Sequence, residues 1–291
     1  MDKQYEEMNL QFTEKGLNKA DESTKEAYKF QVKHRDELLF KIANVLLIYT
    51  ILDSSLSLSN TEKLKLRADF ATIISNIAVD EYNQEKSIIS DILEEVTNDK
   101  YYSDAYTLSI GMDFSLKKLT DKQIKDIVDT SIDGELWSDR LWNNKKELES
   151  TLKLEVEKFL QGKTNVNQIN KVIKDRFSQN AYNTRRLVQT EAARCQNSSN
   201  ELFAEEHGIE KQMFCATLDN KTSEICRGYD GQVFDINDNN KPVPPLHPFC
   251  RSCLINVPFK EWQPIKRKDN STKEIINYKD YNQWKQDKGI E

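Results

Sequence analysis

The chain has 291 residues, of which 31% are charged, and its formal net charge is −6. This length is enough for two ordinary domains, and the acidic balance excludes a global positive field that would draw the protein onto nucleic acid. The N-terminal residues lack the basic-then-apolar order of a secretory signal, and an odd number of cysteines, five, argues against a disulfide scaffold. We therefore expect a protein of the reducing cytoplasm.

The first two-thirds of the chain is expected to be helical, because all six prolines lie at or beyond Pro242. The longest apolar run, Leu38 to Leu52, would span about 22 Å as a helix, whereas a membrane core is about 30 Å thick. We expect this run to form a buried core helix and the chain to make no contact with a membrane.

Two capping signatures mark further helix starts. Ser59 and Glu62 have the spacing of a capping box, and the apolar periodicity after them predicts one long helix with a break near Asp80. Thr120 and Gln123 predict the start of a short helix in the same way.

From residue 137 to residue 206 the apolar spacing predicts three more helices, and Gly208 stands where a left-handed C-cap would end the last one. That last helix, from about residue 180, has an inward face of small side chains and is expected to pack closely against another element. Turn sequences then separate three short predicted strands, near 211–218, 231–234 and 254–257. The pattern indicates an α+β fold, mostly α, in which helices pack on a small β-sheet.

A cluster of side chains that can bind metal lies in the predicted sheet region. It consists of Cys226, His247, Cys250 and Cys253, the last three within seven consecutive positions. Cys3His is a common structural zinc set, and a C-x-x-C turn brings two thiolates onto one ion. We expect these four side chains to bind a structural zinc ion that staples the loop. The other interpretation is a group of small buried thiols in a reducing compartment.

The predicted centre lacks the features of a catalytic one. His247 is followed by proline and phenylalanine, not by the x-Glu of zinc deaminases, and no H-E-x-x-H sequence occurs. Four protein ligands would fill the coordination sphere and leave no position for a reactive water. We therefore predict a structural staple and no catalytic residue.

The order of motifs from Trp137 to Pro258 resembles the minor head proteins of tailed bacteriophages, the head morphogenesis family related to the Mu F protein. The motifs are W-S-D-R at 137, R-L-V-Q-T-E at 186, A-T-L-D at 216, C-R-G-Y-D-G at 226 and H-P-F-C-R at 247. The sequence departs from the family at Ser223, where relatives often have a second cysteine. It also has C-R-S-C where many relatives have C-R-C or C-R-S-T.

The resemblance implies a structural, low-copy virion protein that associates with the portal protein or the major capsid protein during head assembly. Such a protein would assemble in the host cytoplasm and lie inside the capsid or at the portal vertex. We divide the chain into a helical N-terminal domain (1–135), a minor head protein domain (136–258) and a polar C-terminal tail (259–291). The basic run at 266–268 in the tail leaves contact with packaged DNA open.

Two other functions remain open from the sequence. One is a zinc-dependent hydrolase or transferase with Glu191 or Glu224 as general base, which a full coordination sphere disfavours. The other is a zinc-stabilised nucleic-acid-binding module, which the acidic balance disfavours. If Glu191 has no catalytic role, we expect it to be buried in an ion pair with Arg251 or Arg186.

Overall fold

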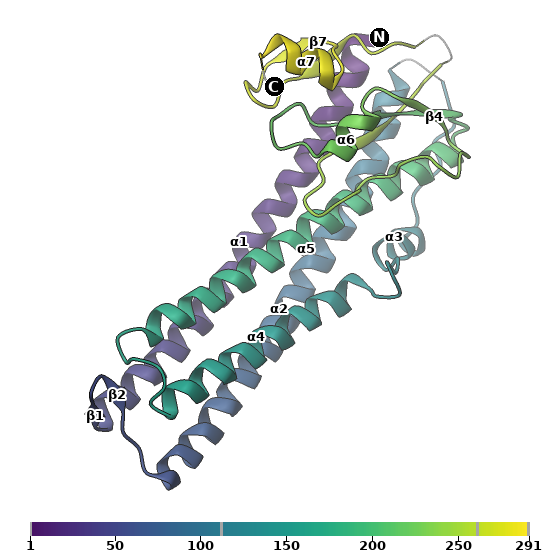
Figure 1. Ribbon diagram of the computed structural model, residues 1–291. Coiled ribbons are helices and arrows are strands. Elements are labelled where there is room, and N and C mark those ends of the chain that lie inside the picture. The colour runs from purple at the N-terminus through teal and green to yellow at the C-terminus, as the bar shows by residue number, and fades with distance from the viewer. Residues whose placement is uncertain (1, 111–112, 260–261, 290–291) are drawn as a thin grey trace. The chain divides into compact units, whose positions relative to one another are not determined.

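The computed structural model describes residues 2–110, 113–259 and 262–289 (Figure 1). Its helices are α1 (Asp2–Ile48), α2 (Asn60–Ser109), α3 (Asp121–Val128), α4 (Trp137–Leu160), α5 (Ile169–Glu206), α6 (Glu224–Tyr229) and α7 (Tyr281–Asp287). Its strands are β1 (Ile51–Leu52), β2 (Ser55–Leu56), β3 (Lys211–Cys215), β4 (Val233–Asp235), β5 (Cys253–Asn256), β6 (Lys266–Lys268) and β7 (Ile275–Asn277). The predicted α+β, mostly α fold is confirmed. No helix among the described residues combines the length and apolar character needed to cross a bilayer.

The chain divides into two compact units, each discontinuous in sequence. One, here the bundle unit, comprises residues 22–90 and 131–187; the other, here the sheet unit, comprises residues 1–21, 91–130 and 188–291. Three of the long helices, α1, α2 and α5, therefore contribute residues to both units. These units are defined by packing and differ from the sequence segments 1–135, 136–258 and 259–291, which remain a prediction.

In the bundle unit, parts of α1, α2 and α5 lie side by side with α4 (Figure 1). Their apolar faces form one core, which includes Leu38, Ile42, Val45, Phe70, Ile74, Leu148, Leu152, Phe159 and Ile173. The apolar run that begins at Leu38 is thus a core helix in its first part, as predicted. Its second part differs, because α1 ends at Ile48 and the side chains of Leu47, Ile48, Ile51 and Leu52 are exposed.

The capping box before α2 is confirmed. The Glu62 carboxylate accepts hydrogen bonds from the Ser59 backbone N–H and hydroxyl, and the Ser59 hydroxyl accepts one from the Glu62 N–H. The break predicted near Asp80 is wrong, because α2 continues to Ser109. The polar residues near Asp80 interrupt the apolar pattern of the sequence but do not end the helix, because some of their side chains are buried in hydrogen bonds with partners on other helices.

Those partners form a polar layer inside the bundle unit. The Lys145 ammonium on α4 donates to Glu81 (3.1 Å) and Glu85 (2.6 Å) on α2 and to Asn180 (3.0 Å) on α5. From α1, His34 Nδ1 lies 3.5 Å from the Glu81 carboxylate. The side chains of Lys145, Glu81 and Glu85 are 0% exposed. All four helices of the bundle unit thus contribute polar groups to one buried layer.

We predict that Lys145→Met lowers the free energy of unfolding by about 3–5 kcal/mol, because Glu81 and Glu85 would remain buried without their cation. Chemical denaturation measures the change. Lys146→Met is the matched control: this neighbouring lysine is exposed above the Trp142 ring, and its loss should cost about 1 kcal/mol or less. Equal losses in the two variants would show that the layer does not depend on its cation.

The stability of this layer should also depend on pH. Burial raises the pKa of the Glu81 carboxyl, but His34 and Lys145 overcome this effect and hold the pKa below its usual value. A lowered pKa in the folded state stabilises the fold above the unfolded pKa of about 4.3, and this contribution is lost as the pH falls toward the folded value.

Helix α5 joins two elements that the sequence analysis separated. It runs without interruption from Ile169 to Glu206, and Gly208 follows with a φ of +68°, the left-handed cap that was predicted. The small side chains of its inward face, among them Ala192, Cys195 and Ser199, are completely buried. Close packing of this helix is therefore confirmed.

The sheet unit contains a three-stranded antiparallel sheet in the order β4-β3-β5. The outer edge of β5 is bonded to α5: the Leu254 N–H donates to the Asn197 side chain, and the Leu254 carbonyl accepts from Asn200. The side chains on the two faces of the sheet belong to different hydrophobic clusters. Met213, Cys215, Cys253 and Ile255 belong to one, whereas Phe214 and Leu254 belong to the other, together with Cys226 and Cys250.

The described part of the predicted polar tail contains strands and a helix. Strands β6 and β7 form a hairpin, and α7 buries Tyr281 and Trp284. Arg267, in the middle of the basic run, is 2% exposed and is paired with Asp230. Its neighbour Lys268 pairs with Glu14. The run is therefore not a row of three free cations.

Candidate metal centre

The first ligand candidate, Cys226, lies in the first turn of the short helix α6. The Ser223 hydroxyl caps this helix by accepting a hydrogen bond from the Cys226 N–H (3.3 Å). Ser223 occupies the place where the resembling proteins often have a second cysteine. In this chain the residue acts as a helix cap.

Two further candidates, His247 and Cys250, lie on a tight turn. The Cys250 N–H donates to the His247 carbonyl (3.1 Å), and Phe249 between them has a φ of +58°, a conformation that is uncommon outside glycine. The Phe249 N–H donates to the hydroxyl of Thr190 on α5 (3.1 Å), which fixes the turn. This arrangement directs His247 and Cys250 toward Cys226.

Cys226, His247 and Cys250 form a possible metal-binding site. The Cys226 Sγ lies 3.3 Å from the His247 Nε2 and 3.7 Å from the Cys250 Sγ. With bonds of about 2.3 Å to sulfur and about 2.0–2.1 Å to nitrogen, tetrahedral zinc would place two sulfurs about 3.8 Å apart and a sulfur and a nitrogen about 3.5 Å apart. Two of the three distances therefore already resemble those between ligands of one ion, and all three ligand atoms lie within 4.8 Å of one another.

The protonation of the three side chains also suits a metal ion. His247 Nδ1 lies 2.9 Å from the carbonyl of Pro248, which can only accept, so Nδ1 carries the proton and Nε2 is free to bind. The hydrogen bond between the two thiols lowers the pKa of Cys226 and raises that of Cys250. Binding of an ion would require both thiols to lose their protons.

The fourth predicted ligand, Cys253, lies elsewhere. It is the first residue of β5, where successive side chains point to opposite faces of the sheet. Cys253 pairs in register with Cys215 on β3, and both lie in the cluster on the far face from Cys226 and Cys250. The structure therefore brings together three of the four predicted ligands. The C-x-x-C spacing did not show that a strand begins at its second cysteine.

A cavity of about 20 Å³ adjoins the ligands and has room for one water molecule. It is lined by Cys226 and His247 together with Thr217, Lys221, Thr222, Ser223, Phe249, Arg251 and Ser252. An ion with three protein ligands would keep a fourth position for water here. The cavity has no room for a substrate, and no carboxylate lines it.

The two residues considered as general bases do not line this cavity. Glu224 is exposed at the start of α6. Glu191 is 1% exposed, as predicted, and accepts a hydrogen bond from Arg194 Nε (2.7 Å), a partner that the sequence analysis did not name. Arg251, one of the partners it did name, forms a bidentate pair with Asp219.

Arg194 links Glu191 to the end of another helix. Its guanidinium donates to the backbone carbonyls of Ile127 (2.7 Å) and Val128 (2.9 Å), the last two residues of α3. Helix ends leave carbonyls without intrahelical partners, so Arg194 stabilises this one. The role visible for Glu191 is to neutralise that buried arginine.

We predict about one zinc ion per chain, bound by Cys226, His247 and Cys250. Cys250→Ser should abolish this stoichiometric binding, whereas Cys253→Ser should retain it, because Cys253 lies on the opposite face of the sheet. Elemental analysis of both variants, and the thiolate-to-cobalt absorption of the cobalt-substituted proteins, would distinguish them. Loss of metal from Cys253→Ser as well as from Cys250→Ser would restore the four-ligand prediction from the sequence.

A second prediction concerns the Glu191 pair. Glu191→Gln should lower the free energy of unfolding by about 2 kcal/mol, because it leaves the buried Arg194 charge without its anion. Glu224→Gln, at an exposed position, should change it by less than about 0.5 kcal/mol. Denaturant titration compares them, and equal stability of both variants with the parent would contradict a buried ion pair at Glu191.

The comparisons with known proteins bear on the chain's C-terminal half. Residues 150–255 match the family model described as Phage Mu protein F like protein. No curated protein and no solved structure gave a significant match. The matched segment includes α5, the three-stranded sheet and all of the candidate ligands. The resemblance predicted from the motifs is thereby confirmed, and residues 150–255 are a Phage Mu F-like segment.

Proposed function

We propose that the chain is a structural minor head protein of a tailed bacteriophage, which associates with the portal protein or the major capsid protein during head assembly. The observation that carries this proposal is the match of residues 150–255 to the Phage Mu F-like family, whose members are phage head proteins. The protein would act by docking and would occupy the capsid interior or the portal vertex of the virion.

The geometry of the candidate metal centre supports a structural role. A zinc ion there would connect α6 to the turn at 247–250, two segments that are joined along the chain by strand β4 and a long irregular loop. The adjoining cavity has room for one water molecule, and none of its lining side chains is a carboxylate that could act as a base. This arrangement suits a staple better than a hydrolase or a transferase.

Direct contact with packaged DNA has weaker support. A DNA-binding surface needs accessible cations, but Arg267 is buried against Asp230 and Lys268 is paired with Glu14. We therefore assign docking to protein contacts and not to the basic run of the tail.

The bundle unit offers an apolar surface outside the family match. Large apolar side chains that are well exposed gather between residues 40 and 64, where α1 ends, β1 and β2 form a hairpin and α2 begins. They are Phe40, Leu47, Ile48, Ile51, Leu52 and Leu64, and Leu47 is 84% exposed. Exposed apolar side chains that form a contiguous patch are typical of interaction surfaces, and these six come from one short stretch of the chain. We assign the contact with the portal protein to this segment.

The test is incorporation of the full chain into heads. Removing residues 1–135 is unsuitable, because Tyr5, Tyr101 and Leu108 belong to the same core cluster as the sheet residues Met213 and Ile255. Point substitutions avoid this difficulty, since exposed apolar side chains contribute little to stability.

We predict that the triple variant Leu47→Ser, Ile48→Ser, Leu52→Ser melts like the parent but no longer enters heads assembled with portal and capsid protein. Leu154→Ser is the control, because Leu154 is an exposed leucine of the same unit on α4. Particle composition is measured by gel electrophoresis and mass spectrometry. Normal incorporation of the triple variant would move docking elsewhere, and failure of the parent chain to enter any head would overturn the proposed function.

A further inference from the structure

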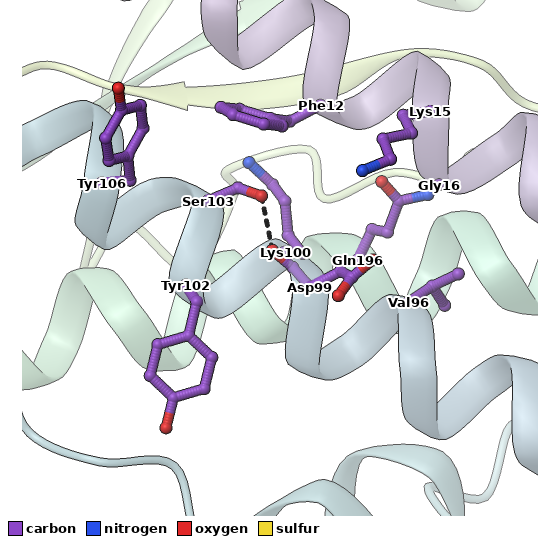
Figure 2. A pocket seen from close by; sticks show the side chains of 10 residues that line it. All are labelled: Phe12, Lys15, Gly16, Val96, Asp99, Lys100, Tyr102, Ser103, Tyr106 and Gln196. Atoms are coloured by element: carbon purple, nitrogen blue, oxygen red, sulfur yellow. Dashed lines mark hydrogen bonds between the residues drawn. The ribbon is translucent and has the colours of Figure 1, made fainter.

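A pocket of about 240 Å³ lies in the sheet unit, away from the candidate metal centre (Figure 2). It is formed by the first part of α1, the second part of α2 and one residue of α5. Its lining residues are Phe12, Lys15, Gly16, Val96, Asp99, Lys100, Tyr102, Ser103, Tyr106 and Gln196. Nothing in the proposed head assembly role uses this pocket.

One end of the pocket is aromatic. The rings of Phe12 and Tyr106 meet edge to face with centroids 6.4 Å apart, and Tyr102 lies one turn of α2 before Tyr106. Tyr106 is 58% exposed although it is a large aromatic side chain. Aromatic rings favour edge-to-face and offset-stacked contacts, so the Phe12 and Tyr106 rings offer a surface on which a further aromatic group can pack.

The other end is polar and is made by Lys15 and Gln196. Lys15 is exposed and has no carboxylate within ion-pair distance among the residues that the structure describes. Gln196 is buried, and its Nε2 has no hydrogen-bond partner in the described part of the chain. A buried amide N–H group that lacks a partner is costly, and an oxygen atom of a bound ligand would satisfy it.

Gly16 creates the space for that amide. A Cβ at this position would lie 2.8 Å from the Gln196 side-chain carbon and oxygen, so the glycine lets the amide lie directly against α1. Glycine inside a helix destabilises it by about 1 kcal/mol relative to alanine. The close approach of Gln196 to Gly16, the residue that follows Lys15, offers a physical reason for the glycine.

The remaining charges of the pocket are already paired. Lys100 donates to Asp104, and Asp99 is bonded to Lys19 (2.6 Å), which also pairs with Glu95. Lys15 is thus the only cation of the lining left for a ligand among the described residues. The acidic side chains nearby would repel a polyanion, so a single carboxylate suits the pocket better than a nucleic acid.

We propose that this pocket binds an aromatic carboxylate, with the ring packed against Phe12 and Tyr106 and the carboxylate held by Lys15 and Gln196. Phe12 and Lys15 are three residues apart on one helix, which places them about 4.5 Å apart along its axis. The carboxylate and ring of a phenylalanine are separated by a comparable distance. The source that fits best is a partner peptide whose last residue is aromatic, because its α-carboxylate is free.

The first test uses defined probes on the full chain. N-acetyl-L-phenylalanine should bind saturably in ligand-observed NMR, and its primary amide should bind at least about tenfold more weakly, because it lacks the charge that Lys15 recognises. Equal binding of acid and amide, or no saturable binding of the acid up to about 10 mM, would overturn the proposal.

Two variants locate the binding. Lys15→Met should weaken it about fivefold or more, and Tyr106→Ala about threefold or more, and both positions are exposed enough to leave the fold intact. Lys25→Met, another exposed lysine of α1, should leave the affinity unchanged. Unchanged binding in Lys15→Met, or displacement of the probe by a single-stranded DNA oligomer, would contradict a carboxylate site.

A second pair of probes separates the sources of the ligand. A tetrapeptide ending in phenylalanine is compared with 3-phenylpropionate. Tighter binding of the peptide supports a protein C-terminus as the natural ligand, whereas tighter binding of phenylpropionate replaces that source with a free aromatic acid. These results do not depend on head assembly, so they fail or succeed separately from the proposed function.

Discussion

The organisation of the sheet unit depends on one buried carboxylate, that of Asp230. Its side chain is 1% exposed, and its two oxygens accept hydrogen bonds from the Ala216 N–H (2.8 Å), the Tyr281 N–H (2.7 Å) and both terminal nitrogens of Arg267. Ala216 directly follows β3, Arg267 belongs to β6 and Tyr281 begins α7. A buried ion is tolerated only when it is paired and fully hydrogen-bonded, and Asp230 meets this condition by joining three separate segments.

This carboxylate also positions the candidate metal centre, because Asp230 is the residue that ends α6. Ser223 caps the start of the same helix, so Cys226 is held from both sides before any ion binds. The turn that carries His247 and Cys250 is held in the same way by Thr190 of α5. Binding of zinc would therefore connect two segments that are already ordered, and the metal would lock the loop more than it would fold the unit.

The sequence contained the local features of the fold, and these were predicted well. Helix caps at Ser59, Thr120 and Gly208 act through neighbours within four residues, and a short window of sequence is enough to read them. Features that depend on distant partners were not visible. The polar residues near Asp80 suggested a helix break. Their buried role was not visible because Lys145, the counterion of Glu81 and Glu85, lies 64 and 60 residues away in the sequence.

The same reasoning applies to the positions of Cys253 and Arg267. The strand was predicted to begin at Leu254, but it begins one residue earlier, at Cys253. Because successive side chains of a strand point to opposite faces, Cys253 lies on the face opposite Cys250. Three basic residues in a row suggested a solvated surface, but β6 alternates, so Arg267 points inward while its neighbours lie at the surface. The buried aromatic residues Tyr281 and Trp284 were the available sign that the tail packs against the unit.

Buried charges recur in both units, and their purpose is better explained by specificity than by stability. Replacing a buried ion pair by apolar side chains is often neutral or stabilising, so such pairs are weak evidence for added stability. A polar layer has another effect: helices that slide or rotate would leave its charges unpaired, and one register is therefore selected. In the bundle unit we infer that the Lys145 layer has this role. Fixing the register of α1 and α2 also fixes which apolar side chains stay exposed between residues 40 and 64, and the docking proposed for this segment would require that surface to be reproducible.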